Sequence, residues 1–240
     1  MSIQTIPLLN LSFAFIPAII TVVILFSWSL KASNALFAIA RMLVQLLMVG
    51  YVLTYIFDIS NSIYILLLLM GMVFISSWIA LGTVGKQRWQ LYRFAVISMV
   101  IGGGVTLLFI TQVVLSLEPW YLPQAMIPIA GMIFSSSMNS ISLAAERLQA
   151  EIQRGVSYTQ ARGIAFQASL IPITNSLFAV GLVSLPGMMT GQILSGVSPL
   201  IAVRYQIMVM CMIFGAAGIA SACFIYWVKP VFLNYSATKN

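Results

Sequence analysis

The chain has 240 residues, of which 61% are hydrophobic and 6% are charged. A soluble domain has about 25% charged residues, so this composition excludes a soluble globular protein and indicates a chain that folds in a lipid bilayer. The net charge of +7 comes from scattered basic residues, without the runs that bind nucleic acid. The sequence contains no histidine, which removes the commonest metal ligand and acid–base catalyst.

Charged and polar interruptions divide the chain into seven apolar segments, each long enough to cross a hydrocarbon core of roughly 30 Å. The segments cover residues 9–30, 34–57, 62–83, 93–117, 124–145, 168–190 and 202–228. The chain is therefore predicted to be an all-α, polytopic integral membrane protein in which residues 1–240 form a single transmembrane domain. The sixth boundary is the least marked, because no charged residue separates that segment from the next.

Basic residues occupy alternate connections between these segments. The odd-numbered connections and the C-terminal tail carry Lys31, Lys86, Arg88, Arg93, Arg147, Arg154, Arg162, Lys229 and Lys239. The even-numbered connections carry Asp58 and Glu118 and no basic residue, apart from Arg204 at the start of the last segment. By the positive-inside rule, this asymmetry predicts seven spans, with the N-terminus outside and the C-terminus in the cytoplasm. The expected location is the plasma (inner) membrane. Residues 1–7 have no basic n-region, so we expect the first segment to be retained rather than cleaved.

The second segment places Asn34, Arg41 and Gln45 on one helix face, at spacings of seven and four residues. An arginine within a span costs about 2.5–3.5 kcal/mol on insertion scales, so its side chain should face protein or water. Arg41 and Gln45 are therefore candidates for the translocation path or its gate. Alternatively, Arg41 snorkels toward the cytoplasmic interface or fixes a helix contact.

The fifth segment carries small polar residues from Ser135 to Ser142, including Asn139. Such residues suit either close helix packing or a polar wall of the path, and Asn139 is a candidate for the second role. In the sixth segment, Pro186 and Gly187 are predicted to break or kink a helix at membrane depth, which is tolerated only beside protein or water. The candidate gate or substrate contacts there are Asn175, Pro186, Gly187, Met188, Met189 and Gln192.

Two simpler interpretations of the sixth segment stay open. Residues 186–192 are also compatible with an ordinary helix end in the outer interface. The methionines supply thioethers, which are soft ligands suited to Cu(I), but methionine also fills irregular apolar gaps. We favour packing for the methionines.

Residues 146–167 form the longest polar stretch, and it lies on the positive side. Leu148, Ile152 and Val156 form an apolar stripe, which predicts a short amphipathic helix, a glycine turn and a second helix that enters the membrane. Such a helix suits docking to an ATPase subunit, although a helix lying on lipid has the same pattern. The candidate coupling residues are Arg147, Glu151, Ile152, Arg154 and Gly155, with Glu151 spaced for ion pairs to both arginines.

The sequence lacks the phosphate-binding pattern G-x-x-x-x-G-K-[ST] and has no convincing catalytic set. We therefore expect a transport subunit rather than an enzyme. It would bind no cofactor, and any ATP would be hydrolysed by a separate chain.

Several motifs carry a resemblance that extends from about residue 30 to residue 228. They are RMLVQLLMVGY at 41–51, IPIAGMI at 127–133, VGLVSLPGMMTGQILSGVSPLIAVR at 180–204 and YQIMV at 205–209. The sequence resembles the FetB-like family, the permease subunits of bacterial iron-export ABC transporters, with plant relatives linked to aluminium tolerance. One departure is Ser135-Ser136, where the family pattern has Gly-Asn, so the substrate does not follow directly from the resemblance.

The resemblance implies a permease that pairs with a second copy of itself and with a separate ATP-binding cassette subunit, and exports iron or a related metal by alternating access. An ABC permease for an organic solute, such as a nucleotide sugar, is one alternative. An ion-coupled secondary carrier is another, although it would usually need an acidic residue well inside a span. The expected surroundings are the lipid bilayer and these subunits, with no nucleic acid.

Overall fold

The computed structural model describes residues 6–57 and 61–232. Regular structure in these residues is helical, apart from one isolated bridge between Val180 and Ser184. The chain divides into two compact units, unit 1 (Met1–Ser60) and unit 2 (Asn61–Asn240). The prediction of an all-α protein is confirmed.

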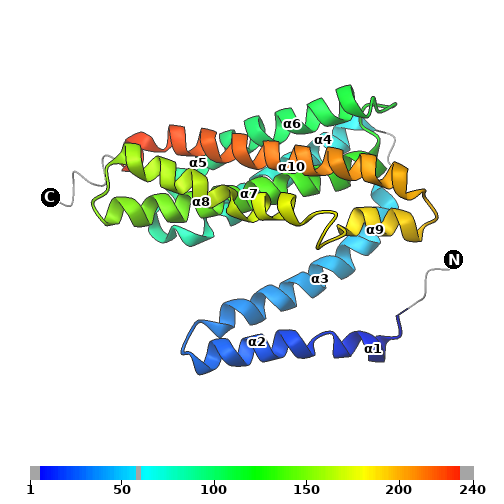
Figure 1. Ribbon diagram of the computed structural model, residues 1–240, viewed down its shortest axis with the longest axis horizontal. Helices are drawn as coiled ribbons and strands as arrows, with labels where there is room; N and C mark the ends of the chain where they lie inside the picture. The colour runs from blue at the N-terminus through cyan, green and yellow to red at the C-terminus, as the bar shows by residue number, and fades with distance from the viewer. Residues whose placement is uncertain (1–5, 58–60, 233–240) are drawn as a thin grey trace. The chain divides into compact units, whose positions relative to one another are not determined.

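Unit 1 is a helical hairpin (Figure 1). Its helices are α1 (Leu8–Phe13), α2 (Ile16–Ser27) and α3 (Ala32–Ile56). Pro17 lies in the first turn of α2, where its missing N–H would have no helical partner anyway. Ser29 has a φ of 57° in the connection between α2 and α3. Among the described residues of unit 1, Ala32 alone is buried, so the apolar side chains of both arms are available to lipid or protein.

Unit 2 is an antiparallel helical bundle (Figure 1). Its α-helices are α4 (Ser62–Ala80), α5 (Arg88–Met99), α6 (Val105–Leu108), α7 (Pro123–Gln153), α8 (Tyr158–Ala179), α9 (Gly187–Leu194) and α10 (Pro199–Trp227). Two 3-10 turns join α4 to α5, namely η1 (Leu81–Thr83) and η2 (Gly85–Gln87). Two π-helical stretches make α5 and α6 parts of one continuous rod, namely η3 (Val100–Gly104) and η4 (Phe109–Val114).

The core of unit 2 lies around α7 and α10. α7 packs against α4, α8 and α10, and α10 also packs against α8, α9 and the rod. The side chains of Ile133, Ile141 and Leu148 on α7 are fully buried, as is Phe224 on α10. These two long helices therefore position everything that the bundle encloses.

Two glycines of η3 allow the rod to approach α7 and α10 closely. A Cβ atom added at Gly102 would lie 2.4 Å from the backbone nitrogen of Ala220, and one at Gly103 would lie 2.8 Å from the ring of Phe134. A side chain at either position would push helices apart, because protein interiors are close-packed.

Arg88 stabilises the connection between α4 and α5. Its Nε donates a hydrogen bond to the carbonyl of Trp78 at 3.0 Å, and its guanidinium carbon lies 3.7 Å from the centroid of the Trp78 ring. The rings of Trp89 and Tyr92 also pack edge-on to Trp78, with centroids 4.8 Å and 5.6 Å away. A basic residue that the sequence assigned to topology therefore also holds two helices together.

Within the described residues, six stretches of helix are long and apolar enough to cross a membrane. They are Leu8–Ser27, Ala32–Ile56, Ser62–Thr83, Arg88–Val114, Pro123–Gln153 and Pro199–Trp227. They overlap the predicted segments one to five and seven, and the prediction of a polytopic membrane protein is confirmed. Two residues of the predicted charge pattern, Asp58 and Lys239, lie outside the described part of the chain. The side chain of Lys86 lies outside it as well.

The predicted sixth segment, 168–190, is not one helix. α8 begins ten residues earlier, at Tyr158, and ends at Ala179, and α9 begins at Gly187. The break therefore precedes Pro186, which stands at the N-cap of α9 rather than inside a kinked helix. Gly181, with a φ of 82°, supplies the left-handed residue in the intervening turn.

α7 runs without interruption past residue 145, the predicted end of the fifth segment, to Gln153. No separate amphipathic helix follows the fifth segment, since no helix-breaking residue occurs between Ser135 and Gly155. The residues predicted to form that helix are the last turns of α7.

Candidate functional site

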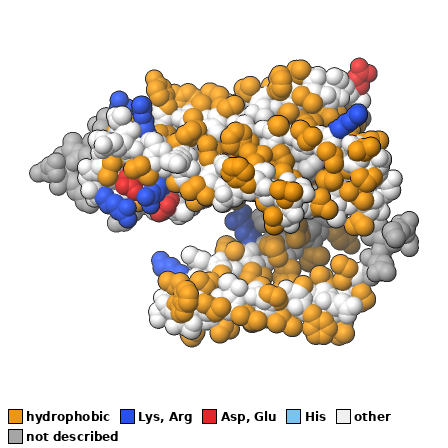
Figure 2. All heavy atoms as spheres, viewed as in Figure 1, with side chains coloured by type: hydrophobic (Ala, Val, Ile, Leu, Met, Phe, Trp, Pro, Cys, Tyr) orange, Lys and Arg blue, Asp and Glu red, His pale blue; other side chains and the backbone are white. Residues whose placement is uncertain are grey.

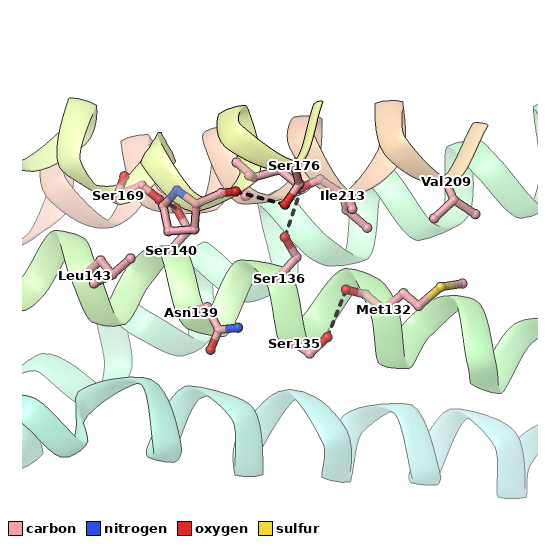
Figure 3. Close-up of a pocket in the computed structure, with 13 residues that line it drawn as sticks. Met132, Ser135, Ser136, Asn139, Ser140, Leu143, Ser169, Ser176, Val209 and Ile213 are labelled. Atoms are coloured by element: carbon pink, nitrogen blue, oxygen red, sulfur yellow. Dashed lines mark hydrogen bonds between the residues drawn. The ribbon is translucent and has the colours of Figure 1, made fainter. Parts of the chain in front are cut away.

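A cavity of about 330 Å³, here called the serine cavity, lies between α7, α8 and α10 (Figure 3). Its polar lining consists of Ser135, Ser136, Asn139, Ser140, Ser169 and Ser176. Its apolar lining consists of Met132, Leu143, Pro172, Ile173, Val209, Ile213 and Ala217. These lining residues include none with a charged side chain, so the cavity offers neutral hydroxyl and amide groups against an apolar wall.

Two of the serines join the helices that enclose the serine cavity. The hydroxyl of Ser136 donates to the carbonyl of Ile213 on α10 at 3.2 Å, and that of Ser140 donates to the carbonyl of Ser169 on α8 at 3.3 Å (Figure 3). Each hydroxyl oxygen keeps acceptor capacity after donating its proton. The cross-helix bonds therefore fix the wall and still leave lone pairs for a bound molecule.

A second cavity, here called the methionine cavity, has a volume of about 450 Å³. Its lining consists of Leu115, Leu117, Gln124, Ala125, Pro128, Ile129, Met132, Met188, Tyr205 and Met208. Met132 lines both cavities, so they follow one another along α7 with this side chain between them. The second cavity presents three thioethers where the first presents hydroxyls.

Two of the predicted path residues in unit 2 line a cavity. Asn139 lines the serine cavity, where its exposed amide is drawn in Figure 3, and Met188 lines the methionine cavity. Asn175 is exposed on α8 and lines neither of the two. Nor do four residues at or in α9, namely Pro186, Gly187, Met189 and Gln192.

Arg41 and Gln45 lie on α3 of unit 1, about one helical turn apart, and both are exposed within that unit. Neither is among the residues that line the two cavities of unit 2. Their role in a path or gate stays a prediction.

The sequence did not single out several lining residues. Ser169, Met132 and Tyr205 lie on three different helices, and nothing in a single sequence shows that these helices turn the same face to one cavity. The available signal was the spacing of Ser136 and Ser140 on one face of α7, and of Ser169 and Ser176 on one face of α8.

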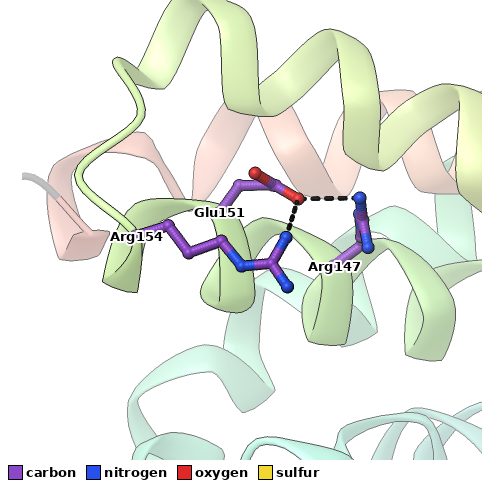
Figure 4. A network of polar contacts seen from close by, with 3 residues as sticks. All are labelled: Arg147, Glu151 and Arg154. Atoms are coloured by element: carbon purple, nitrogen blue, oxygen red, sulfur yellow. Dashed lines mark hydrogen bonds and ion pairs between the residues drawn. The ribbon is translucent and has the colours of Figure 1, made fainter.

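The end of α7 carries the ion pairs that the sequence predicted (Figure 4). One oxygen of Glu151 lies 2.8 Å from Arg147 and 3.3 Å from Arg154. Glu151 is only 4% exposed, whereas the side chains of Arg147 and Arg154 are 40% and 66% exposed. A buried carboxylate is thus paired with two cations that reach the surface.

Gly155 ends α7 in a Schellman motif, which is the glycine turn that the sequence predicted. It has a φ of 82°, its N–H donates to Ile152 at 3.0 Å, and the N–H of Val156 donates to Glu151 at 3.1 Å. Ser157 then stands at the N-cap of α8. The coupling turn, residues 147–157, is therefore fixed by backbone hydrogen bonds and by the ion pairs.

The predicted apolar docking stripe needs correction. Leu148 is fully buried in unit 2, because α7 continues through it and turns that face toward the other helices. Ile152 and Val156 are half-buried. The exposed residues of the turn at 147–157 are therefore mainly polar, and they include Arg154.

The sequence profile of the uncharacterised protein family UPF0014 matches residues 8–233. The chain belongs to this family. The UPF0014 membrane protein slr1647 of Synechocystis is 37% identical, over 74% of each chain. The probable iron export permease protein FetB of Escherichia coli is 32% identical, over 92% of this chain and 91% of FetB. The protein ALUMINUM SENSITIVE 3 of Arabidopsis thaliana is 31% identical, over 92% of this chain and 85% of that protein.

The resemblance predicted from the motifs is confirmed, and this member of UPF0014 is a multi-pass membrane protein. No solved structure matches the chain.

Proposed function

We propose that this UPF0014 protein is the membrane-spanning subunit of an ATP-driven permease that exports iron or a related metal. The observation that carries the proposal is the pair of cavities in series along α7, which share Met132. The name of FetB, a probable iron export permease that aligns with almost the whole chain, supports the cargo.

The neutral lining is compatible with a site that a metal passes through. Within the described residues, no group of three or more Cys, Asp or Glu side chains is arranged to hold a metal ion. Conduction requires binding that is favourable enough for entry and weak enough for release. Hydroxyl, amide and thioether groups give weak neutral contacts, whereas a cage of carboxylates would retain the ion.

The coupling turn is the proposed contact with a separate ATP-binding cassette subunit. Arg147, Ile152 and Arg154 lie on or beside a turn whose geometry is fixed by Glu151 and Gly155. A turn that is rigid transmits a push from the partner to α7 and α8 together. Under this proposal the turn and the C-terminus face the cytoplasm of a plasma or inner membrane, ATP binds only to the partner, and a second copy of the chain completes the permease.

A permease for a hydroxylated organic solute, such as a nucleotide sugar, is the second candidate. The observation that favours it is the serine cavity, whose six polar side chains suit hydrogen bonds to hydroxyl groups better than coordination of a hard cation. The two candidate functions share the translocation path and the ATPase subunit, and they differ only in the cargo.

The test uses cells of the native host in which the gene for this protein is deleted and which express either the wild type or Asn139→Leu. The cells are loaded with radioactive iron, and its efflux is measured. Asn139 is exposed in the serine cavity, so its loss removes a cargo contact. We expect efflux to slow about tenfold, as for the loss of one hydrogen bond in the rate-limiting step. Gln90→Leu is the matched control, because Gln90 is exposed on α5 and lines neither cavity.

Equal efflux by Asn139→Leu and wild type, at equal protein levels, would remove the serine cavity from the path. If deletion of the gene left iron efflux unchanged and made the cells retain a hydroxylated solute, the cargo would be the organic solute and not the metal.

A further inference from the structure

A third cavity, here called the basic pocket, lies between the beginning of α8 and the end of α10. Its volume is about 290 Å³, and it shares no lining residue with the other two cavities. The lining consists of Tyr158, Arg162, Gly163, Phe166, Ala222, Ile225, Tyr226 and Lys229. α8 begins here, directly after the coupling turn, at the end of unit 2 where charged side chains of both signs gather (Figure 2).

Arg162 and Lys229 give this pocket two positive charges. Both side chains are exposed, and neither has an ion-pair partner within the described part of the chain. Glu151, by contrast, is already paired with Arg147 and Arg154. Two cations that line one pocket without an acid attract an anion from outside the protein.

Tyr158 joins the two helices that form the pocket. Its hydroxyl donates a hydrogen bond to the carbonyl of Ile225, so the start of α8 is tied to the last turns of α10. Burial raises the pKa of Tyr158 to about 12, and its phenol therefore stays neutral and does not neutralise Arg162. The pocket is preformed by this bond.

The rest of the lining is apolar and continues along the bundle. Phe166 and Ile225 form the interior, and the small residues Gly163 and Ala222 leave room between the helices. A Cβ atom at Gly163 would meet nothing within 4 Å. Ile219, 46% exposed, and Tyr226, 74% exposed, extend the outward face of α10 on both sides of Ala222. An acyl chain can follow this face away from the charges.

We propose that the basic pocket binds an anionic phospholipid, with the phosphate between Arg162 and Lys229 and an acyl chain along Phe166, Ala222 and Ile219. Basic pockets between helices at a membrane surface bind anionic headgroups, and tyrosines are enriched at that depth. A protein partner is less well suited to this pocket than a lipid, because its apolar floor runs on into the exposed apolar face of α10. The proposal is independent of the transported cargo.

The occupied pocket links α8 to α10 immediately after the coupling turn. We therefore expect the lipid to stabilise this end of unit 2. The headgroup adds charge-assisted hydrogen bonds to two helices that are otherwise joined there by the Tyr158 hydroxyl and by packing.

The test measures thermal unfolding and lipid retention of the full-length protein in mixed micelles that contain either dioleoyl phosphatidylglycerol or the zwitterionic dioleoyl phosphatidylcholine. We expect phosphatidylglycerol to raise the Tm of wild type by about 5 °C or more, at about 100 times its dissociation constant. Native mass spectrometry should retain phosphatidylglycerol in preference to phosphatidylcholine. The double variant Arg162→Gln/Lys229→Gln should lose both effects.

The matched control is Lys31→Gln/Arg204→Gln, which removes the same charge from two exposed residues outside the pocket and should keep both effects. Gly163→Leu fills the pocket while leaving both charges, and it should reduce lipid retention even if the double variant folds poorly. Equal stabilisation of wild type and double variant by phosphatidylglycerol would overturn the proposal.

Two further outcomes assign the pocket to another occupant and also overturn the proposal. Stabilisation of wild type by inorganic phosphate alone, without phosphatidylglycerol, would identify a soluble phosphate ligand. Unchanged lipid retention in the double variant, with loss of a co-purifying ATPase, would identify the pocket as part of the subunit interface.

Discussion

The serine cavity and the methionine cavity follow one another along the same helix, yet they are built differently. Ser136 and Ser140 fasten the walls of the first by hydrogen bonds to α10 and α8. The second is lined by the flexible thioethers of Met132, Met188 and Met208, and α9, which supplies Met188, follows a break in the helical structure.

This difference assigns distinct tasks to the two cavities. Hydrogen-bonded walls hold one geometry and can select a cargo, whereas unbranched methionine side chains adapt their shape at little cost. We therefore expect the serine cavity to recognise the cargo and the methionine cavity to open and close around it, with Met132 as the boundary.

The largest effect should come from overpacking the close contact between η3 and α10. Gly102→Val places a branched side chain against the backbone of Ala220, where even a Cβ would lie 2.4 Å from the nearest atom. We expect little folded protein by size-exclusion chromatography in detergent, since overpacking that shifts side chains and backbone costs about 1–3 kcal/mol or more. Gly218→Ala is the control, because a Cβ there meets nothing within 4 Å, and it should fold normally.

Blocking the boundary between the cavities should slow transport strongly while the protein still folds. Met132→Trp adds volume at the one lining residue that the two cavities share. We expect cargo efflux to fall by about tenfold or more, corresponding to at least about 1.4 kcal/mol in the barrier. The Tm should change far less than in Gly102→Val. Efflux at the wild-type rate would show that the cavities do not form one path.

Removing the cross-helix hydrogen bonds should soften the serine cavity. Ser136→Ala and Ser140→Ala each delete one bond, to Ile213 and Ser169 respectively, at a cost of about 1 kcal/mol. For a chain of this size, we expect the Tm to fall by about 2–4 °C in each variant. Ser135→Ala is the control, since that hydroxyl bonds only the carbonyl of Met132 on its own helix. An equal fall in the control would mean that the cross-helix bonds add no stability.

The smallest effect is expected from Met208→Leu in the methionine cavity. The exchange conserves volume, so the stability should change by less than about 1.5 kcal/mol. If the thioether serves only as a flexible wall, the efflux rate should stay within twofold of wild type. A twofold change corresponds to about 0.4 kcal/mol in the transport barrier. A loss of metal efflux at unchanged Tm would instead make the sulfur a ligand, and the division of tasks between the cavities would have to be reversed.

The sequence predicted features that depend on local geometry. The pairs of Glu151 with Arg147 and Arg154 follow from the spacing of residues on any α-helix, and Gly155 ends a helix because it readily adopts a positive φ. The apolar segments followed from length and composition. These features required no knowledge of which helices are neighbours.

Features that depend on tertiary packing were missed or misplaced. Pro186 was expected to break a helix, but α8 had already ended at Ala179, so the proline begins the next helix instead. The serine cavity combines Asn139 on α7, Ser169 on α8 and Val209 on α10. Its lining depends on how three helices are rotated against one another, which periodicity within each helix does not determine.

Whether this chain forms the path of an ATP-driven permease can be tested by purifying the tagged, full-length protein from its native membrane in a gentle detergent. We expect an equimolar ATP-binding subunit in the complex, with ATP hydrolysis that ferrous or ferric iron stimulates and that Met132→Trp no longer couples to transport. Repeated recovery of the intact protein without any ATPase would contradict this role and favour an ion-coupled carrier.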